Sequence, residues 1–322
     1  MKIYRSLEEV PADFGPCVLT IGNFDGVHLG HRRILRRLRA MADERGWKAS
    51  VLMFDPHPTR VVAPERAPEL MMPPERRAGS MAEEGVEQVL ILPFDAAVAR
   101  LEPAEFVRGV LVERLRVRAV LVGDNFRFGY RHAGNVDLLR RMGHELGFDT
   151  EIVAAVSYRG QVVSSSIIRA RLRAGDVSLA ARYLRRPYAL EGAVVKGRGV
   201  GAKQTAPTLN LATEAELIPK TGVYITRTRD LDGAREWQSI TNIGYRPTFG
   251  ASGQLTIETF LLTDLDGEDP RRIAVEFLRR VRDERKFDTP EALKARILKD
   301  AGAARRYFRR VKAWTERPLA PA

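Results

Sequence analysis

The stretch Gly22-Asn23-Phe24-Asp25-Gly26-Val27-His28-Leu29-Gly30-His31 decides the fold of the first half of the chain. It follows an apolar run, Cys17 to Ile21, that is typical of a buried strand. It precedes a segment in which Ile34, Leu35 and Leu38 recur at helical spacing. We therefore expect a strand, a glycine-containing turn and a helix in this order, with both histidines in the first helical turn.

The start of a helix favours a phosphate, because its free N–H groups and the positive end of its dipole point outward there. Two imidazoles can add hydrogen bonds as negative charge develops, and a glycine lets the backbone come close. The predicted site for a nucleoside triphosphate comprises His28, His31, Gly22, Asn23, Phe24 and Gly30. In the alternative interpretation, one histidine caps the helix and the other lies at the surface. A zinc site has less support, since this spacing supplies two ligands at most and the chain has one cysteine.

The composition is that of an ordinary folded protein of two domains, with 322 residues, 44% hydrophobic and 29% charged. No apolar run approaches the length that spans a membrane, and the first residues do not resemble a signal peptide. We therefore expect a cytoplasmic protein without a membrane partner. The single cysteine, Cys17, lies in an apolar strand and is expected to be a buried small hydrophobe.

The net charge of +12 comes from 53 Lys and Arg against 41 Asp and Glu. Such a charge raises the question of nucleic-acid binding. The arginines are scattered along helices, as from Arg32 to Arg39, and form no concentrated block with interleaved aromatic residues. We expect the charge to attract anionic nucleotides rather than nucleic acid. The oligomeric state is left open.

Short apolar runs alternate with helical patterns from residue 15 to about residue 185, which predicts a parallel sheet with helices on both faces. The further strands are expected at Ala49–Phe54, Gln88–Leu92, Ala119–Gly123 and Glu151–Val156, and helices at Ala104–Leu115 and Val136–Leu146. Ligands of such sheets bind at the carboxyl ends of strands. The histidine motif, the turn Phe54–Pro58 and the turn Gly123–Gly129 all follow strands, so they are expected at one edge.

After Arg185-Arg186-Pro187 the pattern changes to strand-like runs with turns between them, which is typical of a small antiparallel barrel. The runs are Tyr188–Lys196, Val223–Arg229, Gln238–Ile243, Leu255–Leu262 and Ile273–Val281, and a helix over Pro290–Phe308 closes the chain. The predicted domains are residues 1–186 and 187–322.

A second phosphate motif starts a helix at Ser164-Ser165-Ser166-Ile167-Ile168-Arg169. A serine there can cap the helix or bind phosphate, and Arg169 falls on the same helical face as Ser165. An ordinary capped helix with a solvated arginine is the alternative. Together with the histidines, Ser165, Ser166 and Arg169 describe a clamp for a triphosphate.

In the second half, Pro207-Thr208-Leu209-Asn210 follows the glycine-containing stretch Gly197-Arg198-Gly199-Val200-Gly201. Thr208 and Asn210 point the same way on an extended segment, so their oxygens can share one Mg²⁺; a plain turn is the alternative. Glu258 shares a strand face with Phe260 and Leu262, which is an unusual place for a carboxylate unless the face is solvated.

These motifs, in this order and spacing over nearly the whole chain, resemble the prokaryotic bifunctional riboflavin kinase/FAD synthetase family. The residues that carry the resemblance are Gly22–His31, Gly123–Gly129, Ser164–Arg169 with serine in place of the family's threonine, Pro207–Asn210, Asn242–Phe249, Glu258 and Arg282–Phe287.

The resemblance implies a Rossmann-like nucleotidyltransferase domain followed by a riboflavin kinase-like barrel with a C-terminal helix. It implies that riboflavin and ATP give FMN, and that FMN and ATP give FAD and pyrophosphate, with Mg²⁺ assisting. The phosphate of FMN is already ionised at neutral pH and needs no base, whereas the riboflavin alcohol does. All five histidines lie in the first half, so Glu258 is the candidate base.

The remaining assignments follow from the same resemblance. Thr208 and Asn210 would hold Mg²⁺. The further nucleotide-binding candidates are Asn125, Gly199, Gly201 and Pro207. The flavin-binding candidates are Asp25, Phe54, Phe126, Phe128, Arg282 and Glu284. The three aromatic residues are chosen because they lie near the motifs, and ordinary core positions at strand ends are their alternative.

The chain departs from the family at one place. Gln204-Thr205-Ala206 stands where the family usually has Leu-Gly-Phe before Pro-Thr-x-Asn. An FAD synthetase with a degenerate kinase half is therefore one alternative. A remnant of an aminoacyl-tRNA synthetase would need a lysine-rich loop that we do not find. A basic nucleic-acid-binding regulatory protein on a nucleotide-binding fold is the alternative from another class.

Overall fold

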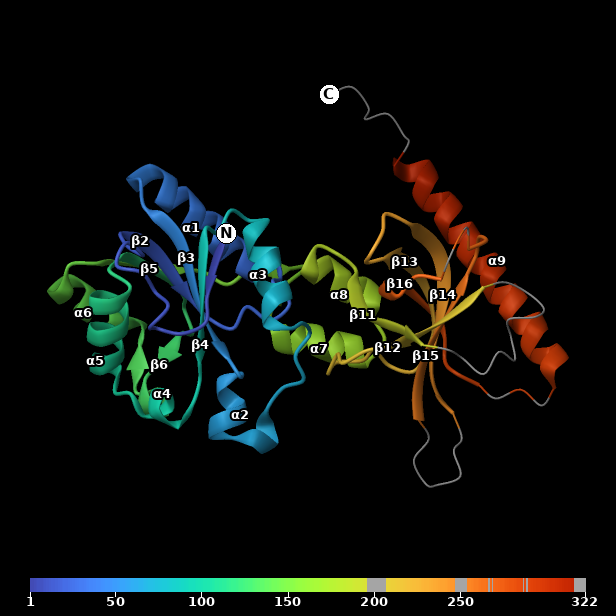
Figure 1. The fold of residues 1–322 in the computed structure, drawn as a ribbon, viewed down its shortest axis with the longest axis horizontal. Helices are drawn as coiled ribbons and strands as arrows, with labels where there is room; N and C mark the ends of the chain where they lie inside the picture. Colours follow the sequence, from blue (N-terminus) through green and yellow to red (C-terminus); the bar gives the residue numbers. More distant parts are fainter. Residues whose placement is uncertain are drawn as a thin grey trace. The chain divides into compact units, whose positions relative to one another are not determined.

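A computed structural model describes residues 1–195, 207–246, 254–265, 267, 269–285, 287 and 289–315. The chain divides into two compact units, Met1–Ile167 and Ile168–Ala322. Each unit is described by itself below, with the labels of Figure 1. None of the helices in the described ranges is both long enough and apolar enough to cross a membrane.

The first unit is built around a six-stranded parallel sheet in the order β1-β4-β3-β2-β5-β8, with helices on both faces (Figure 1). Its elements are β1 Lys2–Tyr4, β2 Cys17–Ile21, α1 Leu29–Arg45, β3 Lys48–Asp55, α2 Pro58–Val62, η1 Pro64–Arg66, α3 Pro74–Ala82, β4 Gln88–Pro93, α4 Ala96–Arg100, α5 Pro103–Glu105, η2 Phe106–Arg114, β5 Val117–Gly123, β6 Arg127–Phe128, η3 Tyr130–His132, β7 Gly134–Asn135, α6 Val136–Leu146, β8 Asp149–Val153, β9 Ser157–Tyr158 and β10 Gln161–Val162.

Every residue of β2 is buried, because the sheet is covered on both sides. Val18 belongs to a core cluster that contains Leu35 and Leu38 of α1. Its neighbour Leu19 belongs to the opposite cluster, with Leu111 of η2. The predicted parallel α/β sheet is confirmed.

The sheet order also brings the three expected turns to one edge of the sheet. Strands β3 and β5 flank β2 and run parallel to it, so the three turns that follow them share one edge. Strand β3 lies on one side of β2, and β5 lies on the other. In an open parallel sheet, the ligand crevice lies at the point where successive strands are added on opposite sides in this way.

The second unit contains two helices, a closed six-stranded barrel and a long helix that lies along the outside of the barrel (Figure 1). The barrel order is β11-β12-β15-β14-β13-β16, and all pairs are antiparallel. The elements are α7 Ser165–Arg173, which begins in the first unit, α8 Val177–Leu184, β11 Tyr188–Val195, β12 Thr208–Ala212, β13 Gly222–Asp230, β14 Glu236–Arg246, β15 Gln254–Leu261, β16 Arg272–Arg282 and α9 Pro290–Thr315. The predicted barrel is confirmed.

The two faces of the barrel strands differ in chemistry. Buried hydroxyls of Thr226, Ser239 and Thr241 hydrogen-bond to one another across the strands. On the alternate positions, Val223 and Ile225 form an apolar cluster with Ala304 of α9. The helix therefore covers part of one strand face, and this explains why the barrel pattern ends with an amphipathic segment.

Several predicted bounds differ from the observed ones; strand β14, for example, spans Glu236–Arg246 rather than residues 238–243. Strand β8 stops at Val153 rather than residue 156, because its partner β5 ends at Gly123, the residue that pairs with Val153. The predicted helix over residues 104–115 winds as a π-helix from Phe106 to Arg114, for which the sequence offers no explanation. Helix α9 continues past residue 308 to Thr315, where residues 309–315 contain no glycine or proline.

Candidate functional site

The turn between β2 and α1 has an unusual backbone. Phe24, Gly26 and Val27 have φ angles of 51°, 84° and 41°, all in the left-handed region. That region suits glycine, but it is strained for a β-branched residue such as Val27. Strain of this kind persists only where the surroundings hold the backbone, and it gathers at functional sites.

Three contacts from distant parts of the chain hold this turn. The Arg77 side chain, fully buried, donates from Nη1 to the Asn23 carbonyl oxygen at 2.7 Å. The Asp25 carboxylate, 2% exposed, accepts the Met71 N–H at 3.0 and 3.2 Å. The Ser165 hydroxyl donates to the Asp25 carbonyl oxygen at 2.9 Å. The turn is therefore rigid before any ligand arrives.

His28 is the N-cap of α1. Its Nδ1 accepts the N–H groups of Gly30 at 3.1 Å and His31 at 3.4 Å. Because Nδ1 is an acceptor in both contacts, the proton of the neutral ring is on Nε2, which is a donor. The capping alternative considered from the sequence is thus correct for His28.

His31 stacks on His28, with ring centroids 3.6 Å apart and planes inclined by 19°. Phe24 packs against the other side at 5.0 Å. Burial, and then the nearby His28, lower the pKa of His31 well below its usual value. His31 is therefore neutral at physiological pH and is not a surface residue.

Some buried polar atoms near this helix start have no hydrogen-bond partner among the described residues. They are His31 Nδ1, Asn23 Oδ1 and Thr20 Oγ1. Polar atoms in a protein interior nearly always have a hydrogen-bond partner, so the few without one often mark a functional site or a bound ligand. A polar ligand at the carboxyl end of β2 would supply the missing partners.

The other predicted phosphate-binding residues are distributed as follows. Gly30 approaches the Cε1 atom of His28 so closely that an added Cβ would lie 3.1 Å from it. Asn125 is exposed in the turn after β5. Ser166 is exposed, while the Ser164 hydroxyl accepts the Ile167 N–H at the start of α7. Arg169 is buried and belongs to the second unit, so its place in the clamp stays a prediction.

The aromatic flavin-binding candidates lie in or against the core of the first unit. Phe128 is buried, and Phe126 stacks on it at 5.6 Å. Phe54 is half-buried and meets Phe94 edge to face at 5.3 Å. Phe54 and Phe126 are therefore partly accessible, whereas Phe128 is buried and packs against Phe126.

A second group of polar residues crosses the barrel in register. Asn210 on β12 lies opposite Glu258 on β15, and Glu258 lies opposite Asn242 on β14. Cβ atoms at such positions are about 5 Å apart. All three side chains are half-buried, and Thr208 lies two residues from Asn210 on the same face of β12. The Glu258 carboxylate therefore lies between two amide side chains. Residues 208–210 form a strand, so the alternative of a plain turn for residues 207–210 is wrong for these three.

Arg282 and Glu284 lie at the end of β16. Arg282 donates from Nε to the Asp300 carboxylate of α9 at 2.8 Å, and its guanidinium lies 5.8 Å from the Phe287 ring centroid. The Glu284 carboxylate lies against Gly244 on β14, where an added Cβ would be 1.8 Å from Oε1. Val223 pairs with both Asn242 and Arg282, so this end of β16 continues the polar row.

The donor set of the row suits Mg²⁺. A threonine hydroxyl, an amide oxygen and a carboxylate are the hard oxygen ligands that this ion prefers. No cluster of three His, Cys, Asp or Glu residues suited to a metal occurs in the part of the chain that the structure describes. Pro207 accepts the Leu261 N–H at 3.0 Å. Gly199, Gly201 and the departure at residues 204–206 lie outside the described residues.

Comparison with known proteins gives the family. A family model described as FAD synthetase matches residues 10–167, and one described as riboflavin kinase matches residues 184–308. A bifunctional riboflavin kinase/FMN adenylyltransferase of Pseudomonas fluorescens is 39% identical, with 95% of this chain and 97% of the relative covered. The enzyme of the same description from Escherichia coli K12 is 36% identical, over 96% and 98% of the two chains. The chain belongs to this bifunctional family.

A solved structure supports the fold of this riboflavin kinase/FMN adenylyltransferase family member. It is described as a macrolide-efflux protein from Streptococcus pneumoniae and has a TM-score of 0.84 at 23% identity, covering 94% of this chain and 98% of that one. At this identity the similarity concerns the fold alone. Both domains of the bifunctional family are present in one chain.

Sequence reasoning did not single out Arg77 or Asp300. Arg77 is one of 53 basic residues, and nothing local distinguishes it from the solvated ones. Asp300 lies in an amphipathic helix where a carboxylate is ordinary, yet it is 3% exposed and receives both Arg282 and Arg296. Asn242 stood inside a quoted motif, but its position beside Glu258 depends on strand register.

Proposed function

We propose that this chain phosphorylates riboflavin to FMN with ATP, and then adenylylates FMN to FAD with release of pyrophosphate. The observation that carries the proposal is the presence of two distinct polar sites. The paired histidines lie inside the segment that matches FAD synthetases, and the Asn210–Glu258–Asn242 row lies inside the segment that matches riboflavin kinases.

For adenylyl transfer, an FMN phosphate oxygen attacks the α-phosphorus of ATP and the bond to pyrophosphate breaks. The FMN phosphate is largely ionised at neutral pH, since the second pKa of a phosphate monoester is about 6. The protein therefore needs no base. Its task is to position the two anions and to stabilise charge on the leaving pyrophosphate.

His28 and His31 are placed for that task. In the proposal, Nε2–H of His28 donates to a phosphate oxygen, while its Nδ1 accepts N–H groups at the start of α1. His31 offers a buried nitrogen that has no partner among the described residues. In the proposal, the N–H groups of the first turn, Ser166 and Arg169 contact the remaining phosphate oxygens. Ser165 would act through the turn that it holds, as well as at the phosphate.

For phosphorylation, the hydroxyl proton of riboflavin moves to the Glu258 carboxylate while its oxygen attacks the γ-phosphorus and the bond to ADP breaks. Thr208 and Asn210 would hold Mg²⁺, which when bound neutralises charge on the ATP phosphates. Asn210 and Asn242 flank Glu258 on the two neighbouring strands. Arg282, held by Asp300, and Glu284 are proposed to contact the flavin.

The test supplies ATP and Mg²⁺ with riboflavin or with FMN, and separates the products by chromatography. Formation of FMN and FAD from riboflavin is expected. The double variant His28→Ala, His31→Ala should make FMN but no FAD, and Glu258→Gln should make FAD from FMN but no FMN. Each variant is the matched control for the other. A wild-type protein that makes FAD from FMN but leaves riboflavin untouched would favour a degenerate kinase half.

Two further points belong to this proposal. The division of labour is between residues 1–186 and 187–322, with α7 and α8 connecting the two catalytic regions. A cytoplasmic location fits substrates such as ATP that are made there, and it fits a chain with a single cysteine.

A further inference from the structure

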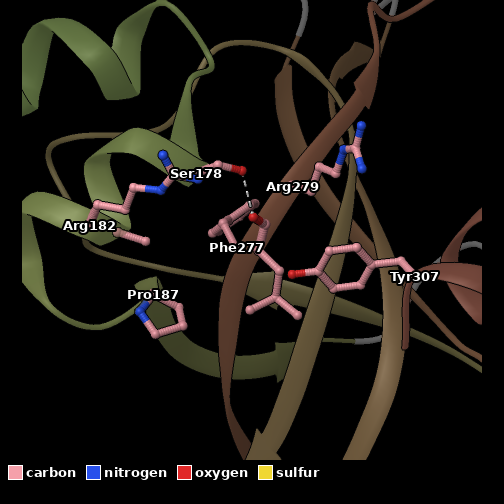
Figure 2. Close-up of a pocket in the computed structure, with 8 residues that line it drawn as sticks. Ser178, Arg182, Pro187, Phe277, Arg279 and Tyr307 are labelled. Atoms are coloured by element: carbon pink, nitrogen blue, oxygen red, sulfur yellow. Dashed lines mark hydrogen bonds between the residues drawn. The ribbon is translucent and has the colours of Figure 1, made fainter. Parts of the chain in front are cut away.

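A hollow of about 550 Å³ lies on the second unit, and none of its lining residues belongs to the Asn210–Glu258–Asn242 row. Helix α8 forms one side, strand β16 the floor and helix α9 the other side, as Figure 2 shows. Its volume is in the range that holds a small molecule. The lining residues are Ser178, Ala181, Arg182, Pro187, Phe277, Leu278, Arg279 and Tyr307.

A β-bulge shapes the floor. In the pairing of β13 with β16, Thr226 lies opposite Phe277 and Ile225 lies opposite Arg279, so Leu278 is the extra residue. The Leu278 carbonyl oxygen accepts the Ser178 hydroxyl of α8 at 2.8 Å (Figure 2). Bulges redirect side chains and are frequent beside binding sites. Here the bulge is fixed to α8 by a hydrogen bond, so the hollow is preformed.

The hollow carries positive charge that nothing in its lining neutralises. None of the eight lining residues is acidic. The side chains of Arg182 and Arg279, which are both exposed, make no ion pair or hydrogen bond with any other residue that the structure describes. Elsewhere in this unit, Arg227 and Arg229 share Glu276.

Hydrogen-bonding groups and apolar surface are arranged on different parts of the wall. Figure 2 shows the Arg182 guanidinium beside Ser178, and the Tyr307 hydroxyl pointing from α9 towards β16. That hydroxyl has no hydrogen-bond partner within the described ranges. Pro187 and Leu278 supply apolar contact area on the floor. Arginine is suited to phosphate because its planar fork binds two oxygens at once.

We propose that this hollow binds a phosphate ester that carries an aromatic ring, a compound of the nucleotide class. The arginines bind the phosphate, the Tyr307 hydroxyl donates to it, and the ring lies on the apolar floor. ATP and FMN both have this chemistry. The site shares no residue with the histidine turn or with the Asn210–Glu258–Asn242 row, so it is a third site on the chain.

The experiment measures hydrogen–deuterium exchange of α8 and of the β16 segment in the full-length protein, titrated separately with inorganic pyrophosphate, ATP, FMN and riboflavin. Ligands also fill the two catalytic sites. The comparison is therefore between wild type, the double variant Arg182→Ala, Arg279→Ala, and the control Arg309→Ala, Arg310→Ala. The control removes the same charge from exposed positions of α9 that make no ion pair with a described residue.

We expect ATP or FMN, and more weakly pyrophosphate, to protect α8 in the wild type and the control. In the double variant the half-protecting concentration should rise roughly tenfold or more, because charge-assisted hydrogen bonds are lost. Rates of FMN and FAD formation should stay within about twofold of the wild-type rates, as for substitutions outside a site. If only ATP or only FMN protects α8, that compound is the ligand of the hollow.

Three results would overturn the proposal. One is the absence of α8 protection by any of the phosphate compounds at concentrations that saturate catalysis. Another is equal protection in the double variant and the wild type. The third is equal protection by riboflavin, which has the ring without the phosphate. Tyr307→Phe, which removes only a hydroxyl, provides a second variant that is expected to fold normally and to weaken binding by a smaller factor.

Discussion

Replacing His28 separates its structural role from its proposed catalytic role. In the structure, Nδ1 of His28 accepts the N–H groups of Gly30 and His31 at the start of α1. Losing an N-cap costs about 1 kcal/mol, within a range of roughly 0.5 to 2. The ring is 5% exposed and stacks on His31 at 3.6 Å, and losing such a contact costs about another 1 kcal/mol. His28→Ala should therefore lose about 2 kcal/mol in the free energy of unfolding.

The variant His28→Asn separates the two roles, because it keeps an N-cap side chain and removes the imidazole. Asparagine is among the best N-cap residues, so it should recover about 1 kcal/mol of the loss. It has no ring nitrogen placed to reach a phosphate. Removing one such donor from a transition state typically lowers the rate about 10² to 10³-fold. We expect His28→Asn to be nearly as slow in FAD formation as His28→Ala, although it is more stable.

Thermal unfolding and FAD formation from FMN measure the two effects independently. About 2 kcal/mol in a unit of this size lowers Tm by roughly 4 to 8 °C. FMN formation from riboflavin, measured on the same samples, is the internal control and should not change. The reasoning would be refuted if His28→Asn made FAD at the wild-type rate, or if His28→Ala unfolded at the wild-type temperature.

Three other predictions follow from buried groups of the first unit. The pKa of His31 is lowered from its usual 6.5, so below pH 6.5 this residue is protonated in the unfolded chain but not in the folded chain. The free energy of unfolding therefore decreases as the pH falls below 6.5. Between pH 7.5 and 5, the free energy of unfolding from urea titrations should fall more steeply than in His31→Gln, and the difference in slope should approach about 1.4 kcal/mol per pH unit only well below pH 6.5; equal slopes would contradict it. Burial raises the pKa of Cys17 to about 12, so a thiol reagent at pH 8 should label the protein only after unfolding. Arg77→Met should cost about 2 to 3 kcal/mol in urea unfolding, because it removes a charged donor to the Asn23 carbonyl, and it should raise KM for FAD formation; an unchanged KM would show that the turn does not need this contact.

The sequence by itself determined the features that depend on neighbours along the chain. The strand at Cys17–Ile21 and the helix at Val136–Leu146 have the predicted bounds, because buried strands and amphipathic helices are specified by local patterning. The order of strands and helices was also sufficient for the fold class. Both histidines were expected at a helix start, since a cap and the first turn involve only adjacent residues.

The tertiary structure alone decided which distant residues complete each site. Arg77, Met71 and Ser165 meet the turn at residues 22–28 from far along the chain. The strained backbone at Val27 is held by these contacts and has no local signature.

The same is true of the barrel. Alternation along β15 placed Glu258 on a face, but only strand register placed it between Asn210 and Asn242. The bulge at Leu278, which shapes the proposed third site, also could not be predicted from the sequence pattern. Residues a few positions apart along the chain set helix and strand propensity and the period of the hydrophobic pattern. Strand register, β-bulges and the contacts of buried charged side chains depend instead on packing between segments that lie tens of residues apart in the sequence.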